Sequence, residues 1–194
     1  MSIYSLALFD PSKLNINIWA FQFVKSIANP ALNTLFSTLS SSFLIVIPIL
    51  VIYLYLKKDK NVYSFIIAGT VFFIVSDIIK MLTMEPRPCN VPQLSWINNL
   101  GCENTFSFPS NHASVLTGLI FFLKPYKYLR VLYFIWLALE LFGRVYLGLH
   151  YFTDVIAGIA LSIILYYVLS FYKPKINEML NNIVKKIVPK LALK

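Results

Sequence analysis

One long apolar segment ends and the next begins within the stretch Gly143-Arg144-Val145-Tyr146-Leu147-Gly148-Leu149-His150-Tyr151-Phe152-Thr153-Asp154. An arginine, a histidine and an aspartate stand here, where a membrane segment normally carries only apolar or interfacial residues. Ionisable groups at membrane depth are costly, and by default they mark a functional site. We therefore expect the rest of the chain to bring further polar residues to this point.

The composition of the 194-residue chain is typical of an integral membrane protein. Hydrophobic residues make up 58% of it and charged residues 13%, whereas a soluble domain carries about 25% charged residues. The mean hydropathy is +0.71, and the length allows one compact bundle without a separate soluble domain. The net charge of +9 comes from cations that flank apolar segments, which indicates membrane topology and headgroup contacts rather than nucleic-acid binding. No cleavable signal peptide is expected, because the first residues lack a basic stretch before an apolar core.

We expect an all-α fold, a polytopic membrane helix bundle with five transmembrane helices. A span needs about 20 mostly apolar residues. The expected spans are residues 34–56, 62–83, 110–123, 129–149 and 152–172. Residues 14–28 contain Gln22 and Lys25 and are short for a span, so we expect a helix in the membrane interface, with a sixth membrane helix as the alternative.

The C-terminal residues 173–194 are expected to form a basic amphipathic helix. Their apolar residues fall on one helical face and their lysines lie near the other, which is typical of a helix resting on an anionic leaflet. We therefore divide the chain into a membrane helix-bundle domain, residues 1–172, and this tail, which is not a separate domain.

The positive charges predict the orientation. Most Lys and Arg residues lie in the 57–60 loop, the 124–130 loop and the tail, all on one side of the expected bundle. The positive-inside rule places that side, with the C-terminus, in the cytoplasm of a multi-pass cell-membrane protein. The 84–108 loop then faces outward, where Cys89 and Cys102 are candidates for a disulfide, with two unpaired thiols as the alternative.

Polar residues from four segments meet at the outward end of this bundle. The second span ends there, the third begins there, and the fourth and fifth join there. The residues concerned are Lys80, Arg87, Ser110, His112, Arg144, His150 and Asp154. The topology permits all of them to converge in one pocket, although spacing alone does not prove that they do.

The chemistry of this set suits a phosphate. Three cations offer donors to phosphate oxygens, and Ser110 with the first backbone N–H groups of a helix adds an anion-binding terminus. Two histidines can divide the roles of nucleophile and acid. Asp154 follows His150 by four residues, so on a helix its carboxylate can orient one ring nitrogen. Binding of zinc or iron is the less favoured alternative, because the cations would repel a metal.

Three patterns in these residues resemble the motifs of the type 2 phosphatidate phosphatase superfamily of integral membrane lipid phosphatases. They are Lys80-x6-Arg87-Pro88, Pro109-Ser110-Asn111-His112 and Arg144-x5-His150-x3-Asp154, in the family's order. Any one pattern is weak, but three in order that use both histidines of the chain are specific. The resemblance covers residues 60 to 172 approximately.

The resemblance implies a metal-independent hydrolase of phosphomonoesters or pyrophosphates without a cofactor. His150 would be the nucleophile and form a phosphohistidine, Asp154 would orient it, and His112 would protonate the leaving oxygen. The phosphoryl oxygens would be held by Lys80, Arg87, Ser110, Asn111 and Arg144. The family usually has Gly where Asn111 stands and Ser where Gly143 stands, and both departures blur the substrate assignment.

Two of the cations also have structural explanations. Lys80 lies three residues after Asp77, and Arg144 lies four residues after Glu140. Each pair shares a helical face and can form an ion pair. The pair with Glu140 would position the arginine.

We expect a membrane lipid phosphatase that acts on the outer face. Small bundles with short loops in the resembling family include polyprenyl pyrophosphate phosphatases of the undecaprenyl or dolichyl type, which recycle a lipid carrier of surface-glycan assembly. Phosphatidylglycerophosphate and phosphatidate are the alternative substrates. A non-catalytic anion- or lipid-binding membrane protein is the alternative of another class, although no internal repeat is present. The expected partners are a lipid phosphate and the bilayer, and the oligomeric state is left open.

Overall fold

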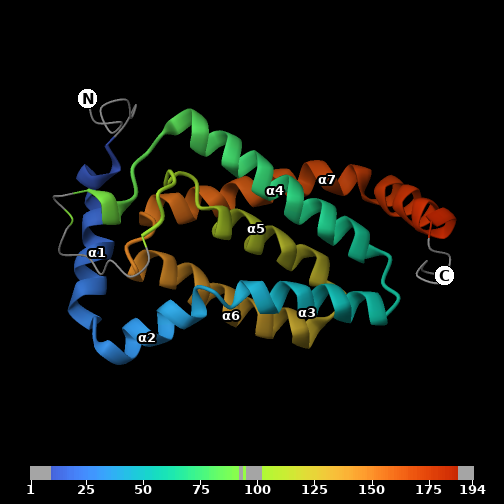
Figure 1. Cartoon of the computed structure of the whole chain (residues 1–194), viewed down its shortest axis with the longest axis horizontal. Helices are drawn as coiled ribbons and strands as arrows, with labels where there is room; N and C mark the ends of the chain where they lie inside the picture. Colours follow the sequence, from blue (N-terminus) through green and yellow to red (C-terminus); the bar gives the residue numbers. More distant parts are fainter. Residues whose placement is uncertain (1–9, 92–93, 95–101, 188–194) are drawn as a thin grey trace.

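The computed structural model describes residues 10–91, 94 and 102–187, and these form an elongated helix bundle (Figure 1). Seven α-helices lie within those residues. They are α1 (Asn15–Ile27), α2 (Pro30–Leu39), α3 (Phe43–Leu56), α4 (Asn61–Thr83), α5 (Asn111–Ile120), α6 (Lys127–Tyr146) and α7 (Phe152–Ile187). The expected all-α bundle is confirmed.

Within the part of the chain that the structure describes, length and apolar composition identify fewer candidate spans than the five that the sequence predicts. By length and apolar composition, α4 and α7 are candidate spans, and α2 with α3 counts as a third if the pair, bent by 42°, is one span. Helix α5 is followed directly by the short 3-10 turn Phe121–Leu123, and even with this turn it is too short to count as a candidate span. Helix α6 is long enough but carries Glu140 and Arg144 in its last turns. The expectation of five spans is therefore supported for two or three of them.

The first expected span, residues 34–56, is broken, so its prediction as one helix was wrong. Helix α2 ends at Leu39 and α3 begins at Phe43, with three serines between them. Serine competes with the helix for backbone hydrogen bonds, which favours a break. At this break, the carbonyl of Ser40 accepts a hydrogen bond from Arg144 Nη2 at 3.0 Å, which helps to hold the arginine in place.

Helix α7 continues through the boundary that the sequence suggests at residue 172. It runs without interruption across Pro174 to Ile187 (Figure 1). Its later turns are tied to α4, because Asn177 Oδ1 accepts from Ser64 N at 3.1 Å and from Ser64 Oγ at 2.6 Å. The predicted separate tail helix is thus an extension of α7 as far as Ile187, and residues 188–194 lie outside the described residues.

Helix α1 lies across one end of the bundle (Figure 1). It is shorter than a span requires and exposes Trp19 to 67%, as suits an interfacial helix. Its buried Asn17 anchors it, since the side chain donates to Thr153 Oγ1 at 3.0 Å and accepts from Thr153 N at 3.1 Å. Helix α1 therefore satisfies a backbone donor at the start of α7.

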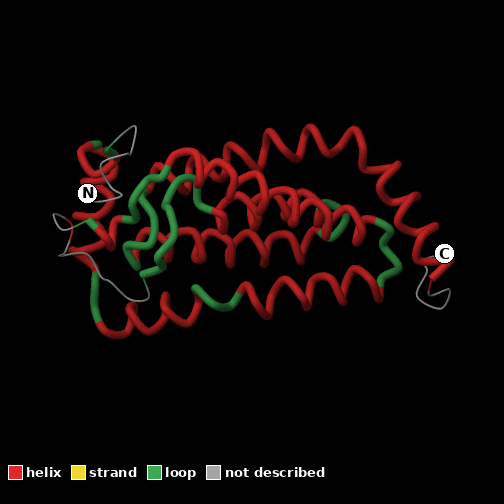
Figure 2. Tube along the Cα trace, turned by 45° about the horizontal axis from the view of Figure 1, so that its top comes forward, coloured by secondary structure: helices red, strands yellow, loops and turns green. Residues whose placement is uncertain are grey.

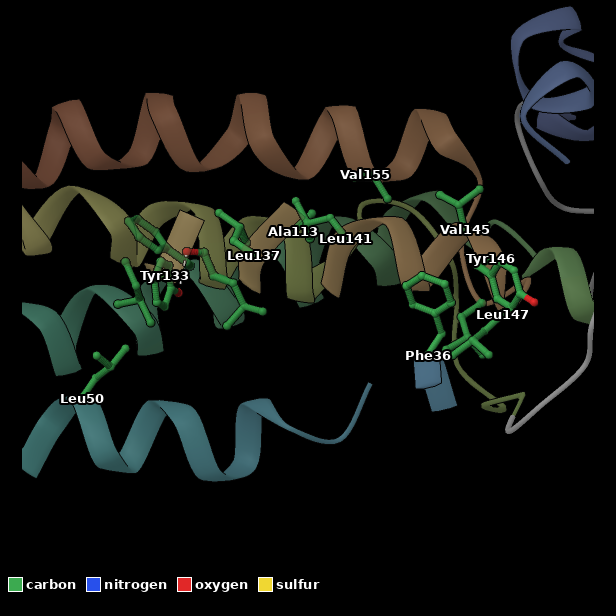
Figure 3. Packing of buried hydrophobic residues seen from close by; sticks show 14 of the residues in the cluster. Phe36, Leu50, Ala113, Tyr133, Leu137, Leu141, Val145, Tyr146, Leu147 and Val155 are labelled. Carbon is green, nitrogen blue, oxygen red and sulfur yellow. Dashed lines mark hydrogen bonds between the residues drawn. The ribbon is translucent and has the colours of Figure 1, made fainter. Parts of the chain in front are cut away.

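Buried apolar side chains fill the space between the helices (Figure 3). At one end of this core, the ring of Phe36 packs on Tyr146 with centroids 4.7 Å apart. Helices α5 and α7 approach very closely at Gly158, where an added Cβ would lie 2.7 Å from both Ala113 Cβ and Ser110 O. This close packing fixes the start of α5 against the start of α7.

Loops gather at the end of the bundle where α1 lies (Figure 2). Helices α4 and α6 end there, and helices α5 and α7 begin there (Figure 1). The bundle thus brings the ends of four helices to one place, as the sequence predicts for its polar residues.

Candidate active site

The predicted site residues lie together at this end of the bundle. Lys80 is in the last turn of α4, Arg144 is in the last turn of α6, and Asp154 is in the first turn of α7. Arg87 and His150 come from the intervening loops, and both side chains are buried. Charged side chains are rarely buried unless they are paired or hydrogen-bonded, so each of them must have partners in the protein.

His150 and Asp154 form the pair that their spacing predicts. His150 Nδ1 lies 3.3 Å from Asp154 Oδ2. The same oxygen accepts from Ser107 Oγ at 2.5 Å and from Tyr151 N at 2.9 Å. With Nδ1 on the carboxylate, the other ring nitrogen, Nε2, points to Arg87 Nη1 at 3.1 Å. One nitrogen is therefore oriented by an anion, and the other faces a cation that can bind phosphate.

A tight turn places His150 between the two helices. The backbone N–H groups of Leu149 and His150 both donate to the carbonyl of Arg144, at 3.1 and 3.2 Å. Gly148 has a φ of 68°, a conformation that glycine adopts without a steric penalty. The carbonyl of Gly148 accepts from Cys89 N at 3.1 Å, so the loop that follows Arg87 is fastened to the same turn.

Arg87 and Lys80 are held by backbone carbonyls. Arg87 donates to Leu149 O at 2.8 Å and to Thr105 O at 3.1 Å, and its Nη2 lies 2.7 Å from Glu103 Oε2. Lys80 Nζ donates to the carbonyls of Phe106 and Ser107 at 3.0 and 2.9 Å. No ion pair between Lys80 and Asp77 occurs among the salt bridges of the described residues.

The electrostatic surroundings keep the His150 ring neutral. Burial lowers the pKa of His150 well below its ordinary value, and the positive charges of Arg87, Lys80 and Arg144 lower it further. An unprotonated imidazole retains the lone pair that a nucleophile needs. All three cations therefore favour the neutral form of the ring that we expect, from the sequence, to be the nucleophile.

A cavity of about 250 Å³ lies beside this cluster. Its lining includes His112, Arg144 and Glu103, together with Ser40 and Phe43. Arg144 also pairs with Glu140 at 3.4 Å, the contact that their spacing of four predicts, and both side chains are buried. The Nε2 atom of His112 is buried and has no hydrogen-bond partner among the residues that the structure describes. His112 and Arg144 are thus presented to a space where a ligand can reach them.

Ser110 and Asn111 occupy the start of α5. Ser110 is the N-cap, and its side chain accepts from Ala113 N at 3.4 Å, so the hydroxyl serves the helix. Its backbone N–H donates to Asp154 O at 3.1 Å. Asn111 Nδ2 contacts Asp77 Oδ1 at 3.4 Å. Both residues lie at the site, but their side chains are engaged with the protein.

The structure adds site residues that sequence reasoning missed. Ser107 is fully buried and bonds Asp154, while Glu103 and Thr105 bond Arg87. Their one signal in the sequence is a polar stretch directly before the Pro109-Ser110-Asn111-His112 pattern. This stretch follows Cys102, which forms a disulfide with Cys89. The bridge links the Arg87 loop to the residues that bond Arg87.

The charged residues here do not form an evident metal centre. No group of three or more His, Cys, Asp or Glu side chains suited to a metal ion is found in residues 10–91, 94 and 102–187. The two histidines share the site with Lys80, Arg87 and Arg144. Of these cations, Arg144 lines the cavity together with His112 and the carboxylate of Glu103.

Comparison with known proteins gives a consistent result. The sequence model of the PAP2 superfamily matches residues 59–178. An undecaprenyl-diphosphatase of Sulfolobus acidocaldarius is 26% identical over 164 residues, which are 81% of this chain and 79% of that protein. The phosphatidylglycerophosphatase B of Bacillus subtilis is 28% identical over 156 residues, which are 72% of each chain.

Two solved structures share the fold. One is a transmembrane PAP2 type phosphatidylglycerolphosphate phosphatase from Bacillus subtilis, with a TM-score of 0.66 and 21% identity over 89% of this chain and 91% of that one. The other is Aquifex aeolicus LpxE, with a TM-score of 0.72 and 23% identity over 84% of this chain and 100% of that one. At these identities the likeness concerns the fold alone.

Proposed function

The chain belongs to the PAP2 superfamily and is a multi-pass membrane lipid phosphatase, and from this premise we propose that it removes a terminal phosphate through a phosphohistidine at His150. The observation that carries the proposal is the position of the His150 ring. Nδ1 faces Asp154 Oδ2 at 3.3 Å, and Nε2 faces Arg87 Nη1 at 3.1 Å. A carboxylate on one ring nitrogen leaves the other basic and aimed.

In the first step, Nε2 of His150 attacks the phosphorus atom of the terminal phosphoryl group. A P–N bond forms, and the bond from phosphorus to the bridging oxygen breaks. His112, which lines the cavity, gives a proton to that oxygen as general acid. The lipid leaves as an alcohol, or as a monophosphate when the substrate is a diphosphate.

In the second step, water replaces the histidine. His112 has lost its proton and accepts one from water, whose oxygen attacks the phosphorus atom. The P–N bond breaks and inorganic phosphate is released. The catalyst returns to its starting state, because the proton that His112 gave in the first step is recovered in the second.

The cations supply the charge stabilisation that this chemistry requires. Lys80, Arg87 and Arg144 are fixed by protein contacts before substrate arrives. Preorganised donors of this kind stabilise charge in the transition state without reorganisation. Asn111 would contribute its backbone N–H at the start of α5, whereas Ser110, whose own N–H donates to Asp154 O, would contribute its hydroxyl proton. We therefore propose a reaction without a metal ion or a cofactor.

The proposed substrate is a polyprenyl diphosphate of the undecaprenyl or dolichyl type. Support comes from the relative named undecaprenyl-diphosphatase, whose match extends over 81% of this chain. Phosphatidylglycerophosphate is the second candidate, since the Bacillus subtilis relative bears that activity in its name. Phosphatidate is the third, and it shares the same terminal phosphomonoester chemistry.

The proposed location of the site is the outer face of the cell membrane. The 57–60 and 124–130 loops lie at the end of the bundle opposite the site, where α3 ends and α6 begins. They are rich in Lys and Arg, which favours the cytoplasm for that end. The C-terminal end of α7 lies with them (Figure 1).

The experiment that tests the function is phosphate release in detergent. Purified wild type and His150→Ala would be given a polyprenyl diphosphate, phosphatidylglycerophosphate and phosphatidate in parallel, each with EDTA. We expect the fastest release from the diphosphate, no loss with EDTA, and at least a ~1,000-fold loss in the variant.

Each alternative gives a different pattern in that experiment. Faster release from phosphatidylglycerophosphate would replace the substrate but keep the chemistry. Loss with EDTA that a divalent cation restores would contradict the metal-free scheme. A wild type with an intact thermal transition and no release from any of the three would favour a non-catalytic lipid-binding protein.

A further inference from the structure

Glu85 is a buried acidic residue that the proposed reaction does not yet use. It follows the end of α4, and only 7% of its surface is exposed. Its backbone carbonyl accepts from Ser107 N at 2.7 Å. Ser107 in turn donates to Asp154, so Glu85 is joined to the His150–Asp154 pair through the backbone of a neighbouring residue.

The side chains of Glu85 and Asp154 are also in direct contact. The two carboxyl groups lie close enough for their charges to interact and for one to donate a hydrogen bond to the other once it carries a proton. Glu85 Oε1 and Asp154 Oδ1 are both buried, and neither receives a hydrogen bond from any N–H or hydroxyl group of the described residues. Two carboxylates cannot bond one another when both are ionised, so one proton must lie between them.

The other charged and titratable groups around Glu85 do not remove this need. Lys80 acts on Glu85 through its charge, but its Nζ is directed to two backbone carbonyls. The charge of Asp10 also acts on Glu85, and the charge of Glu85 acts on Tyr151. Neither Asp10 nor Tyr151 supplies a positive charge. A second negative charge at this buried position would be compensated only in part.

The donors around Asp154 indicate which carboxyl holds the proton. Asp154 Oδ2 receives Ser107 Oγ and Tyr151 N, and it also faces His150 Nδ1. Donors directed at a carboxylate favour its ionised form. Glu85 has no such set of donors for its side chain among the described residues. The proton is therefore assigned to Glu85, which donates it to the carboxylate of Asp154.

We propose that Glu85 is a positioning residue, a neutral carboxylic acid that holds the Asp154 carboxylate in the orientation that directs His150. The hydrogen bond from Glu85 adds to those from Ser107 Oγ and Tyr151 N, and together they oppose rotation of the carboxylate away from the imidazole. Only the catalytic consequence of this inference rests on the proposed function, because the protonation of Glu85 is a property of the folded chain.

The test combines two substitutions with a control at the other end of α7. Glu85→Gln keeps an N–H donor for Asp154 but cannot ionise, whereas Glu85→Ala removes the donor. Glu178→Gln changes an acid far from the site. We expect kcat in Glu85→Ala to fall about 10- to 100-fold, the range seen when a partner that orients a catalytic ligand is lost. Glu85→Gln should stay within a few-fold of wild type near neutral pH.

The pH profile separates positioning from a merely structural role. As pH rises, wild type loses the shared proton, two negative charges face one another, and kcat falls. Glu85→Gln has no such proton, so its alkaline limb should move to higher pH, while Glu178→Gln should keep the wild-type profile. An unchanged alkaline limb in Glu85→Gln, or full activity in Glu85→Ala, would overturn the proposal. If Glu85→Ala does not fold, the Glu85→Gln profile decides alone.

Infrared spectroscopy gives a readout that does not depend on activity. A protonated carboxyl group absorbs in a C=O region where carboxylates do not. We expect wild type at neutral pH to show such a band and Glu85→Gln to lack it. The absence of that difference would refute a neutral Glu85 even in an active enzyme, whereas its presence in a protein that releases no phosphate would leave Glu85 protonated and reject the proposed reaction instead.

Discussion

Arg87 makes two kinds of contact, which suit the two roles proposed for its guanidinium, in the fold and in phosphate binding. Its Nε and Nη1 atoms donate to backbone carbonyls, which fix the plane of the group. Its Nη2 atom faces the carboxylate of Glu103, a side chain that is 49% exposed and lines the cavity. A carboxylate and a phosphate oxygen suit the same fork of an arginine. In the proposed reaction, Glu103 would therefore compete with the phosphate for this donor.

Removal of that competing charge should strengthen substrate binding. We expect Glu103→Gln to lower KM a few-fold with kcat nearly unchanged, since a half-exposed ion pair is worth about 1 kcal/mol or less. Steady-state kinetics at low and high salt would measure this, and screening should shrink the difference at high salt. A raised KM would mean that Glu103 assists binding and would contradict this account.

Some site residues were predictable from the sequence, and others were not. His150, Asp154, Arg87 and Lys80 stand out because ionisable groups are rare in and beside apolar segments. The spacing of four residues predicts the contact of His150 with Asp154, although His150 lies in the turn before α7 and not on the helix. Ser107 could not be found in this way, because a loop serine has no periodicity. Its contact with Asp154 depends on the tertiary course of the loop before α5, which the local sequence pattern does not reveal.

The helices show the same division between local pattern and tertiary contact. Hydropathy predicted α4 and the first part of α7, because each contains an apolar run long enough to cross a membrane as a helix. It did not predict the break between α2 and α3, because the gain there is a contact between Ser40 and Arg144 from distant parts of the chain. The continuation of α7 likewise depends on the contact of Asn177 with Ser64.

The close approach of α5 and α7 should be sensitive to a single methyl group. In Gly158→Ala the new Cβ would meet backbone and side-chain atoms at 2.7 Å, and overpacking of this kind costs about 1–3 kcal/mol. The shift would separate Ser110 N from Asp154 O, now 3.1 Å apart. We expect a lower thermal transition and reduced kcat, measured on the purified variant.

Gly69 provides the matched control. It is also a helical glycine, but an added Cβ there meets Leu119 only at 3.7 Å or more. Alanine is the better helix former, by about 0.5–1 kcal/mol. Gly69→Ala should therefore keep its activity and melt at the same or a higher temperature. Equal effects of the two substitutions would show that the packing at Gly158 is not special.

The proposed orientation of the bundle in the membrane rests on its charge distribution. If the site faces outward, the disulfide between Cys89 and Cys102 lies on the outer side as well. After mild reduction of intact cells, a membrane-impermeant thiol reagent should label one or both cysteines. Labelling that requires lysis would place the site in the cytoplasm and would remove the support that orientation lends to a polyprenyl carrier as substrate.

Formation of a phosphoryl bond to His150 is the step on which the proposed reaction depends. The measurement is rapid quenching of wild type and His150→Ala with a substrate labelled in its terminal phosphate, followed by peptide mapping of the protein-bound label. We predict an acid-labile, base-stable label on the peptide that contains His150 in wild type, and none in the variant. An active wild type that never carries label, or carries it on a different residue, would contradict the role of His150 as the nucleophile.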